Sequence, residues 1–402
     1  MDGHDHRILN GILKARRDLQ APEQASALLA RDIEVVAPPE RIVDSDLWPC
    51  VWALASVLGR QFHGRVYLDC GLDRPLPSPG ELPSNCIFGR GGLPTADRIH
   101  VGAAPSVGAG LIGDARGNAV GYGALLPDDV PAHPIASFAL AGYLGFSALA
   151  NAIGIPPFRA DLAKRTHVLS FDPSVRVLPC RELSLIGLGH LGHAYLALLW
   201  FLRLDDVHLH LVDKERFGPE NYATQILMAR SEDAGQFKAP HLAKLLRERG
   251  VDAIGARDEV TWGWSRPETH PATVLVGVDD LDVRRMILAS GYEWFFEAGL
   301  GDDFTRPRFT WHVLRGGDSS GTAFRQGQSN GALAANPALE RALRDTPGEC
   351  GWLTFKATTA SAPSMGLVAA AHVIGELLSE RRQVAGSGLV WSPVLPTWRQ
   401  FI

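Results

Sequence analysis

The feature that most constrains the fold of this chain is the glycine pattern Gly187-Leu-Gly189-His-Leu-Gly192. It follows residues 182–186, a short apolar run bounded by glycine that predicts a buried parallel strand, and it opens a helix predicted over residues 191–202. In such a turn the first glycine permits the tight bend, the second lets a nucleotide approach the backbone, and the third lets helix and strand pack closely. The N-H groups of the helix start favour an anion. The pattern therefore predicts a dinucleotide or adenine-nucleotide site.

Strands and helices alternate after this pattern. Strands are predicted over residues 207–212 and 273–278 and a helix over residues 239–249, which indicates an α/β fold with a doubly wound parallel sheet. Asp213 ends the first of these strands, where a carboxylate accepts hydrogen bonds from ribose hydroxyls. On these residues alone, an NAD-dependent oxidoreductase remains an open alternative.

The first half of the chain shows a weaker version of the same organisation. Helices are predicted over residues 8–19, 25–33, 47–62 and 134–153, and strands over residues 65–69, 98–102 and 119–126. This half has no Gly-x-Gly-x-x-Gly, but each half ends in a helix of small residues opened by proline, at Pro134 and Pro363. We interpret residues 1–160 as a degenerate, inactive copy and residues 176–402 as the active one, joined by a polar connection over residues 156–175. Two unrelated α/β pieces are the alternative.

Composition excludes several classes of function. The net charge of -5 over 402 residues supplies no basic field for nucleic acid. The apolar stretch 135–155 contains Ser, Asn and Gly and is expected to be a buried helix, so no membrane span is expected. The start of the chain shows no secretory signal. Five cysteines without a C-x-x-C pair give no zinc pattern and fit a reducing cytoplasm.

Three further blocks carry a resemblance to a known family. Asp213-Lys-Glu-Arg-Phe-Gly-Pro-Glu-Asn221-Tyr-Ala-Thr-Gln225 resembles the ThiF and ubiquitin-activating (E1-like) family, in which a strand-end acid leads to Asn-Leu-x-Arg-Gln. Gly235-Gln-Phe-Lys238 matches the family's Gly-x-x-Lys, and residues 274–284, with Asp279, resemble its strand-Asp-Asn-x-x-x-Arg block. The resemblance covers residues 181–300 and, more loosely, the last helix and the first half. It implies the Rossmann-like adenylation fold of that family.

The resemblance assigns roles to residues. Lys238 would neutralise the α-phosphate of ATP, Asp279 would hold Mg²⁺, and Asn221 and Gln225 would bind at the same mouth as Gly187, Gly189, Gly192 and Asp213. Each has a simpler alternative: a solvated lysine at a helix start, a helix cap at Asp279, a turn at Asn221. Arg284 is expected to be structural and to pair with Asp280 or Asp282.

One departure and one cysteine complete the prediction. The family's phosphate-binding arginine is Thr224 here, so the site lacks one cation, and Arg16 and Arg17 are the candidates to replace it. Cys350, in Pro347-Gly-Glu-Cys-Gly-Trp-Leu, resembles the Cys-Gly that precedes the last apolar helix in bacterial ThiF-family proteins. It is the predicted nucleophile that receives the acyl group.

The resemblance implies an enzyme that uses ATP and Mg²⁺ to adenylate the C-terminal glycine of a ubiquitin-like protein. A thioester on Cys350 and transfer to an E2-like conjugating enzyme would follow, as in bacterial Bil-type antiphage systems. A sulfur-carrier adenylyltransferase, an NAD-dependent oxidoreductase and a non-catalytic scaffold are the alternatives. Whether two copies of the chain associate, or only the two halves within it, stays open.

Overall fold

A computed structural model shows two α/β halves, each built on one sheet. It describes residues 6–16, 18–19, 21–43, 47–89, 97–103, 110–123, 125–127, 130–155, 165–169, 171–175, 178–202, 206–228, 233–300, 309–317, 362–379, 387–391 and 399–401. Both halves contribute to one large hydrophobic core. The fold class predicted from the glycine pattern and the strand–helix alternation is confirmed.

The first sheet has the order β3-β2-β1-β4-β5-β6-β7. Its strands from β3 to β5 run parallel, and β6 and β7 are added antiparallel. The strands are β1 (Ile33–Val36), β2 (Val66–Asp69), β3 (Cys86–Phe88), β4 (Asp97–Val101), β5 (Leu111–Arg116), β6 (Ala119–Tyr122) and β7 (Arg165–Val168). The helices of this half are α1 (His6–Ala15), α2 (Pro22–Leu29), α3 (Pro39–Val43), α4 (Trp48–Gln61) and α5 (Pro134–Ala152).

The second sheet has the order β10-β9-β8-β11-β12-β13-β14-β15, parallel as far as β12 and antiparallel beyond it. Its strands are β8 (Glu182–Ile186), β9 (His208–Val212), β10 (Ala253–Ala256), β11 (Thr273–Val276), β12 (Trp294–Leu300), β13 (Phe309–Arg315), β14 (Ser387–Trp391) and β15 (Arg399–Phe401). The helices are α6 (His190–Phe201), α7 (Lys238–Glu248), α8 (Leu281–Ala289) and α12 (Pro363–Leu378), with a short 3-10 turn, η2, at Pro219–Asn221.

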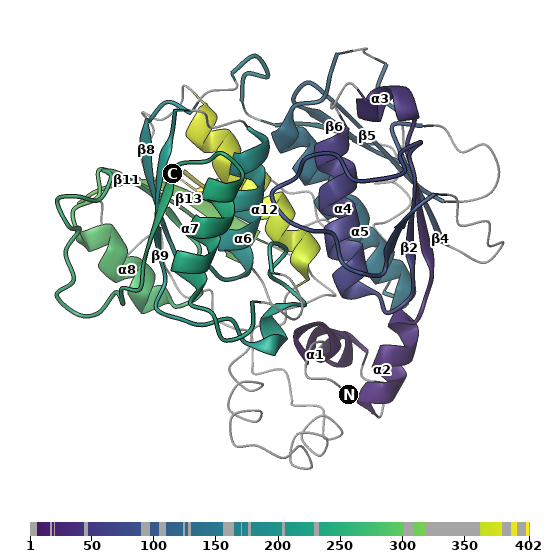
Figure 1. The fold of residues 1–402 in the computed structure, drawn as a ribbon, viewed down its shortest axis with the longest axis horizontal. Coiled ribbons are helices and arrows are strands. Elements are labelled where there is room, and N and C mark those ends of the chain that lie inside the picture. Colours follow the sequence, from purple (N-terminus) through teal and green to yellow (C-terminus); the bar gives the residue numbers. More distant parts are fainter. Residues whose placement is uncertain are drawn as a thin grey trace.

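The two halves repeat one topology. Seven strands of the second sheet, from β8 to β14, occur in the same chain order and sheet order as β1 to β7. The helix before the last of these strands is α5 in the first half and α12 in the second, and the two pack against each other between the sheets (Figure 1). Close packing there depends on small residues: a Cβ on Gly142 of α5 would lie 2.5 Å from the Val368 side chain of α12. The first half is thus a copy of the second in architecture.

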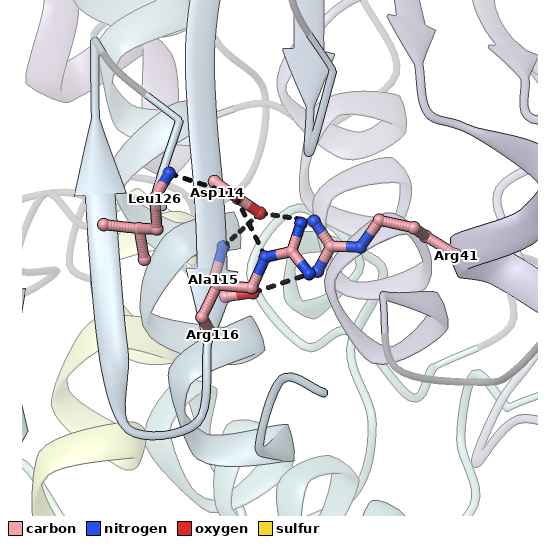
Figure 2. Close-up of polar contacts among 5 residues, drawn as sticks. All are labelled: Arg41, Asp114, Ala115, Arg116 and Leu126. Carbon is pink, nitrogen blue, oxygen red and sulfur yellow. Dashed lines mark hydrogen bonds and ion pairs between the residues drawn. The ribbon is translucent and has the colours of Figure 1, made fainter. Parts of the chain in front are cut away.

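The first half lacks the glycine turn of its counterpart. β1 leads into Ala37-Pro38-Pro39, and prolines have no N-H group to offer an anion. Figure 2 shows what lies at this end of the sheet: the Arg41 guanidinium donates to Asp114 Oδ1 over 2.6 Å and to the Ala115 carbonyl over 3.1 Å. Arg41 also lies against β4, since a Cβ on Gly102 would be 2.7 Å from its Nη1. Protein atoms therefore fill the edge of the first sheet beside Gly102.

Two sequence predictions for the first half were wrong. The helix expected over residues 25–33 ends at Leu29, and Ile33 begins β1, an interior strand that lies between β2 and β4. Glu34 interrupted the apolar signal, yet its buried carboxylate is paired with Arg98 of β4 at 2.7 Å. The polar connection 156–175 contains β7, whose polar residues suit an edge strand.

The helix α5 is the one described helix that is long and apolar enough to cross a membrane. In the structure 94% of its apolar window is buried. It packs against α4 and α12, so the buried helix expected from residues 135–155 is confirmed.

Candidate functional site

A cavity of about 440 Å³ opens at the carboxyl ends of β8, β9 and β11. The chain order reverses here, because β9 lies on one side of β8 and β11 on the other, and such a switch point is where open α/β sheets bind ligands. Most of the predicted site residues meet at this cavity. Those that line it are Gly187, Gly189, Asp213, Gln225, Lys238 and Asp279.

The glycine turn has the close contacts that its sequence requires. Gly187 has a φ of +88°, which side-chain-bearing residues rarely adopt. A Cβ on Gly192 would lie 2.3 Å from the Gly187 carbonyl oxygen, so the helix α6 packs directly on the turn. A Cβ on Gly189, by contrast, would have no atom closer than 4.0 Å, so there is open space before the start of α6. The backbone at Gly189 thus borders the cavity at the start of a helix, where an anion is favoured.

Asp213 ties the next strand end to the turn. Its Oδ2 accepts from the Leu188 N-H over 2.6 Å, and its Oδ1 accepts from the Glu215 N-H over 2.7 Å. Burial raises the pKa of Asp213 above its ordinary value, against the opposing effects of Lys238 and of these two N-H groups. Each carboxylate oxygen has a second lone pair, so the group can still accept from a ligand hydroxyl.

Lys238 is the first residue of α7 and lines the cavity, and a backbone hydrogen bond positions this end of the helix. The Lys238 N-H donates to the Glu215 carbonyl over 2.9 Å, which fixes the helix start beside the end of β9. The Lys238 side chain is only 3% exposed, and its Nζ donates to Glu215 Oε2 over 2.6 Å. Glu215, which the sequence analysis assigned no role, is 60% exposed. The lysine is therefore not a solvated surface residue.

In the segment from Asn221 to Gln225, the first side chain stabilises a turn and the last belongs to a residue that lines the cavity. Asn221 Oδ1 accepts from the Gly218 N-H over 3.0 Å, so this amide stabilises η2, and Asn221 does not line the cavity. Gln225 does line it, and its buried Oε1 has no hydrogen-bond partner among the described residues. Thr224 is fully buried and lies off the cavity lining. An unpaired buried acceptor at a cavity wall is suited to a ligand donor.

Both halves brace this segment. Arg60, on α4 of the first half, donates to the Met228 carbonyl over 3.0 Å and lies 4.9 Å from the centre of the Tyr222 ring. On α6 of the second half, His193 Nδ1 accepts from the Leu227 N-H over 3.1 Å. Burial lowers the pKa of His193 well below its ordinary value, and Lys238 and Arg60 lower it further, which keeps this acceptor unprotonated. The first half thus supports the wall of the cavity in the second.

Asp279 stands at the other side of the cavity. It is exposed and follows β11 through Gly277 and Val278. The cap of α8 is the next residue, Asp280, whose Oδ1 accepts from the N-H groups of Asp282 and Val283 over 2.7 and 3.1 Å. The capping role considered for Asp279 therefore falls to its neighbour. Asp279 itself is an exposed residue of the cavity lining.

The pairing predicted for Arg284 was wrong. Its Nη1 donates to Glu297 Oε2 on β12 over 2.8 Å, while Asp282 pairs with Arg285 instead. The sequence did not indicate a role for Glu297, which lies in the apolar strand Trp-Phe-Phe-Glu-Ala-Gly-Leu. The one available signal was the charge itself, because a carboxylate in a buried strand requires a partner.

Arg16, one of the two arginines proposed to replace the family's missing one, does not line the cavity. Arg16 donates to Asp18 and to the Ile153 carbonyl in the first half. Arg17 lies outside the described residues, and so does Cys350. The cations that line the cavity are Lys214, Lys238 and Arg284.

The described residues fit a magnesium nucleotide. The lining holds the carboxylates of Asp213, Glu215, Asp258, Glu259, Asp279 and Asp280 against these three cations. A polyphosphate entering alone would meet a net negative wall, whereas a bound divalent ion would offset most of the excess negative charge. Among the described residues, no group of three His, Cys, Asp or Glu side chains forms a metal site. The ion would take one or two carboxylates, Asp279 foremost, and complete its shell with phosphate oxygens and water, as Mg²⁺ does.

Comparisons with known proteins give a relative, similar solved structures and a family. The chain is 30% identical over 217 residues to "Bacterial E1-like protein BilD" of Collimonas sp. (strain OK412). The aligned residues cover 52% of this chain and 46% of that protein, so the match spans about half of the relative's length. The structure of E. coli MccB gives a TM-score of 0.38 at 11% identity, covering 62% of this chain and 68% of that one. MccB with MccA-N7isoASN gives 0.37 at 12%, covering 55% and 64%. Residues 178–386, more than half of the chain, match the family described as "BilD C-terminal domain", and the chain belongs to this E1-like family.

Proposed function

We propose that this protein uses ATP and Mg²⁺ to adenylate the C-terminal glycine of a ubiquitin-like protein. The observation that carries the proposal is that Lys238, Asp279 and Gln225 line one cavity at the glycine turn. A hydride-transfer enzyme needs the turn and Asp213 but has no use for a buried lysine and a free carboxylate on either side of it. Acyl adenylation needs both.

The reaction consists of the attack of a carboxylate oxygen on the α-phosphorus of ATP. An O-P bond forms, the bond from that phosphorus to the bridging oxygen breaks, and pyrophosphate leaves. The carboxylate is already ionised at neutral pH, so no general base is required. Lys238 would stabilise the negative charge that develops at the α-phosphate, and Asp279 would hold a divalent ion, which supplies positive charge for the leaving pyrophosphate. The amides of the glycine turn and Asp213 orient the nucleotide.

We further propose that the Cys350 thiolate attacks the acyl carbon of the adenylate, so that a C-S bond forms, the C-O bond to the phosphate breaks and AMP leaves. The acyl group would then pass to the cysteine of an E2-like partner, with Cys350 as the leaving thiolate, as part of bacterial antiphage defence. Two observations support a thiol from this segment. The chain re-enters the described structure at α12, whose Pro363 carbonyl lies 3.2 Å from Nε2 of His190, beside the glycine turn. From Cys350 to Pro363, at ~3.3 Å per residue, the chain can reach ~40 Å.

Three of the other four cysteines are poorer nucleophiles than an ordinary thiol. Burial raises the pKa of Cys86 to about 12, and burial also raises the pKa of Cys50 and of Cys70. A thiol held protonated attacks slowly, because the thiolate is the nucleophile. Within the E1-like class, this favours the thioester route through Cys350.

The first half is proposed to be inactive in adenylation. Its sheet edge has prolines where the second half has the glycine turn, and Arg41 packs against Gly102 there. Its role would be to brace the active cavity through Arg60.

Exchange of labelled pyrophosphate into ATP, in the presence of a ubiquitin-like protein from the same genome, tests the proposal. Exchange that depends on the carrier's C-terminal glycine and on Mg²⁺ is expected. Tight binding of NAD in place of ATP would favour the oxidoreductase. ATP binding without exchange would favour the non-catalytic scaffold.

A further inference from the structure

The strand β12 contains a carboxylate that no proposed step uses. Glu297 is fully buried, with Arg284 Nη1 at 2.8 Å from its Oε2 and Nδ1 of His312 bonded to its Oε1. The histidine stands directly opposite Glu297 on β13, in register with it. A buried carboxylate requires such partners, and an arginine with a planar donor fork is thereby held in one orientation.

The other contact of the same guanidinium points toward the cavity. Arg284 Nε donates to the Val278 carbonyl over 2.8 Å, and Val278 immediately precedes Asp279. Arg284 itself lines the cavity. The loop is confined from the opposite side by the glycine turn, because a Cβ on Gly187 would lie 2.5 Å from the Val278 side chain. The loop that bears Asp279 is thus held between the glycine turn and one arginine.

Asp279 has no anchor of its own in the described part of the chain. It is exposed, and its carboxylate has no hydrogen bond or ion pair to a described residue, whereas Asp280 and Asp282 each have one. The direction of its side chain therefore depends on the backbone that Arg284 holds. A carboxylate that is to bind a metal ion gains affinity when its position is fixed before the ion arrives.

We propose that Arg284, locked by Glu297 and His312, is a positioning residue that holds the Asp279 carboxylate where it binds the magnesium of the nucleotide. This inference rests on the proposed use of MgATP. Arg285, the next residue, shows the ordinary alternative: it makes a surface ion pair with Asp282, whose side chain is 81% exposed.

Calorimetric titration with ATP, once with excess Mg²⁺ and once with EDTA, tests the role. The wild-type protein should bind ATP more tightly with Mg²⁺. Arg284→Met should lose most of this gain, about tenfold or more, in addition to the loss of ATP affinity in EDTA that follows from removing one cation of the cavity. Arg284→Lys keeps the charge but cannot serve both acceptors in the same planar geometry, so it should lose a large part of the gain. Arg285→Met is the matched control and should behave as the wild type.

The outcomes separate the two proposals. A wild-type protein whose ATP binding does not respond to Mg²⁺ overturns the proposed function, and this role with it. If the wild type gains affinity and Arg284→Lys gains equally, the positioning role alone is overturned. The same holds if Arg284→Met lowers affinity equally with Mg²⁺ and with EDTA, since that is the result of a general structural defect. Thermal unfolding of each variant identifies one that fails to fold, in which case Arg284→Lys decides.

Discussion

Gly277 and Gly187 lie so close that a Cβ on Gly277 would be 2.5 Å from the Gly187 carbonyl oxygen. The loop that carries Asp279 therefore rests on the turn that receives the nucleotide. The two loops pack backbone against backbone at these glycines, so a shift of one loop requires a shift of the other. This contact would couple the positions proposed for the phosphates and for the Asp279 carboxylate.

Replacing Gly187 should cost more unfolding free energy than its positive φ alone explains. Gly187→Ala would place a methyl group 2.5 Å from the Val278 side chain at a φ of +88°, whereas Gly235→Ala faces a φ of +84° with nothing within 4 Å. We expect Gly235→Ala to cost about 1 kcal/mol of unfolding free energy and Gly187→Ala about 2–4 kcal/mol. Denaturant titration measures both. Equal costs would contradict the close contact, and ATP affinity should fall only in Gly187→Ala.

Asp279→Ala should abolish carrier-dependent pyrophosphate exchange, because the leaving pyrophosphate loses its divalent ion. The control is Asp282→Ala, three residues along the chain, where an exposed carboxylate pairs with Arg285. It should exchange at the wild-type rate. Undiminished exchange in Asp279→Ala would remove this residue from the magnesium role.

Lys238→Met keeps the buried stem of the side chain and removes the charge. We expect the exchange rate to fall about 10²–10³-fold, the usual effect of removing one group that stabilises transition-state charge. The surface lysine Lys244, on the same helix and 3.8 Å from Glu248, provides the comparison. Lys244→Met should leave the rate unchanged. A Lys238→Met enzyme with full activity would assign the α-phosphate to another cation.

Cys350→Ala should keep pyrophosphate exchange and lose a reductant-sensitive adduct between the enzyme and its carrier. Adenylation precedes the thiol step, so the two readouts separate. Cys86→Ala is the control, because burial raises the pKa of that thiol to about 12. Its adduct should persist. Non-reducing gel electrophoresis checks both, and an adduct that survives in Cys350→Ala would identify another thiol as the carrier.

Acidification should destabilise the second half through two buried histidines. Burial lowers the pKa of His210, as do His208 and His270 nearby, and burial is also the main cause that lowers the pKa of His270. Below their unfolded pKa of about 6.5 the unfolded chain binds more protons than the folded one, so stability is lost as pH falls. Each contributes at most about 1.4 kcal/mol per pH unit. In denaturant titrations at pH 7, 6 and 5, His210→Gln should flatten this dependence, and an unchanged slope would contradict it.

Sequence reasoning succeeded where chemistry and backbone geometry share the same residues. The turn at Gly187 was predicted because its glycines are needed both for the bend and for the approach of α6. Lys238 was found through the spacing Gly235-x-x-Lys238, and it is buried at the cavity as the start of a helix. The strand β1 was missed because Glu34 hides an otherwise apolar run, and only its pairing with Arg98 across the sheet explains it.

The sequence alone determined the class of fold, the nucleotide turn and most of the residues around it, since these depend on local patterns: glycine spacing, strand–helix alternation and acids at strand ends. Tertiary structure alone decided how residues distant in the chain are paired. Arg284 bonds to Glu297 rather than to its helix neighbours, Asp280 takes the cap and leaves Asp279 free, and Arg60 of the first half supports the cavity of the second. The reason is physical: a buried charge selects the partner that burial places within reach, and no spacing along a single chain records which strand lies beside it.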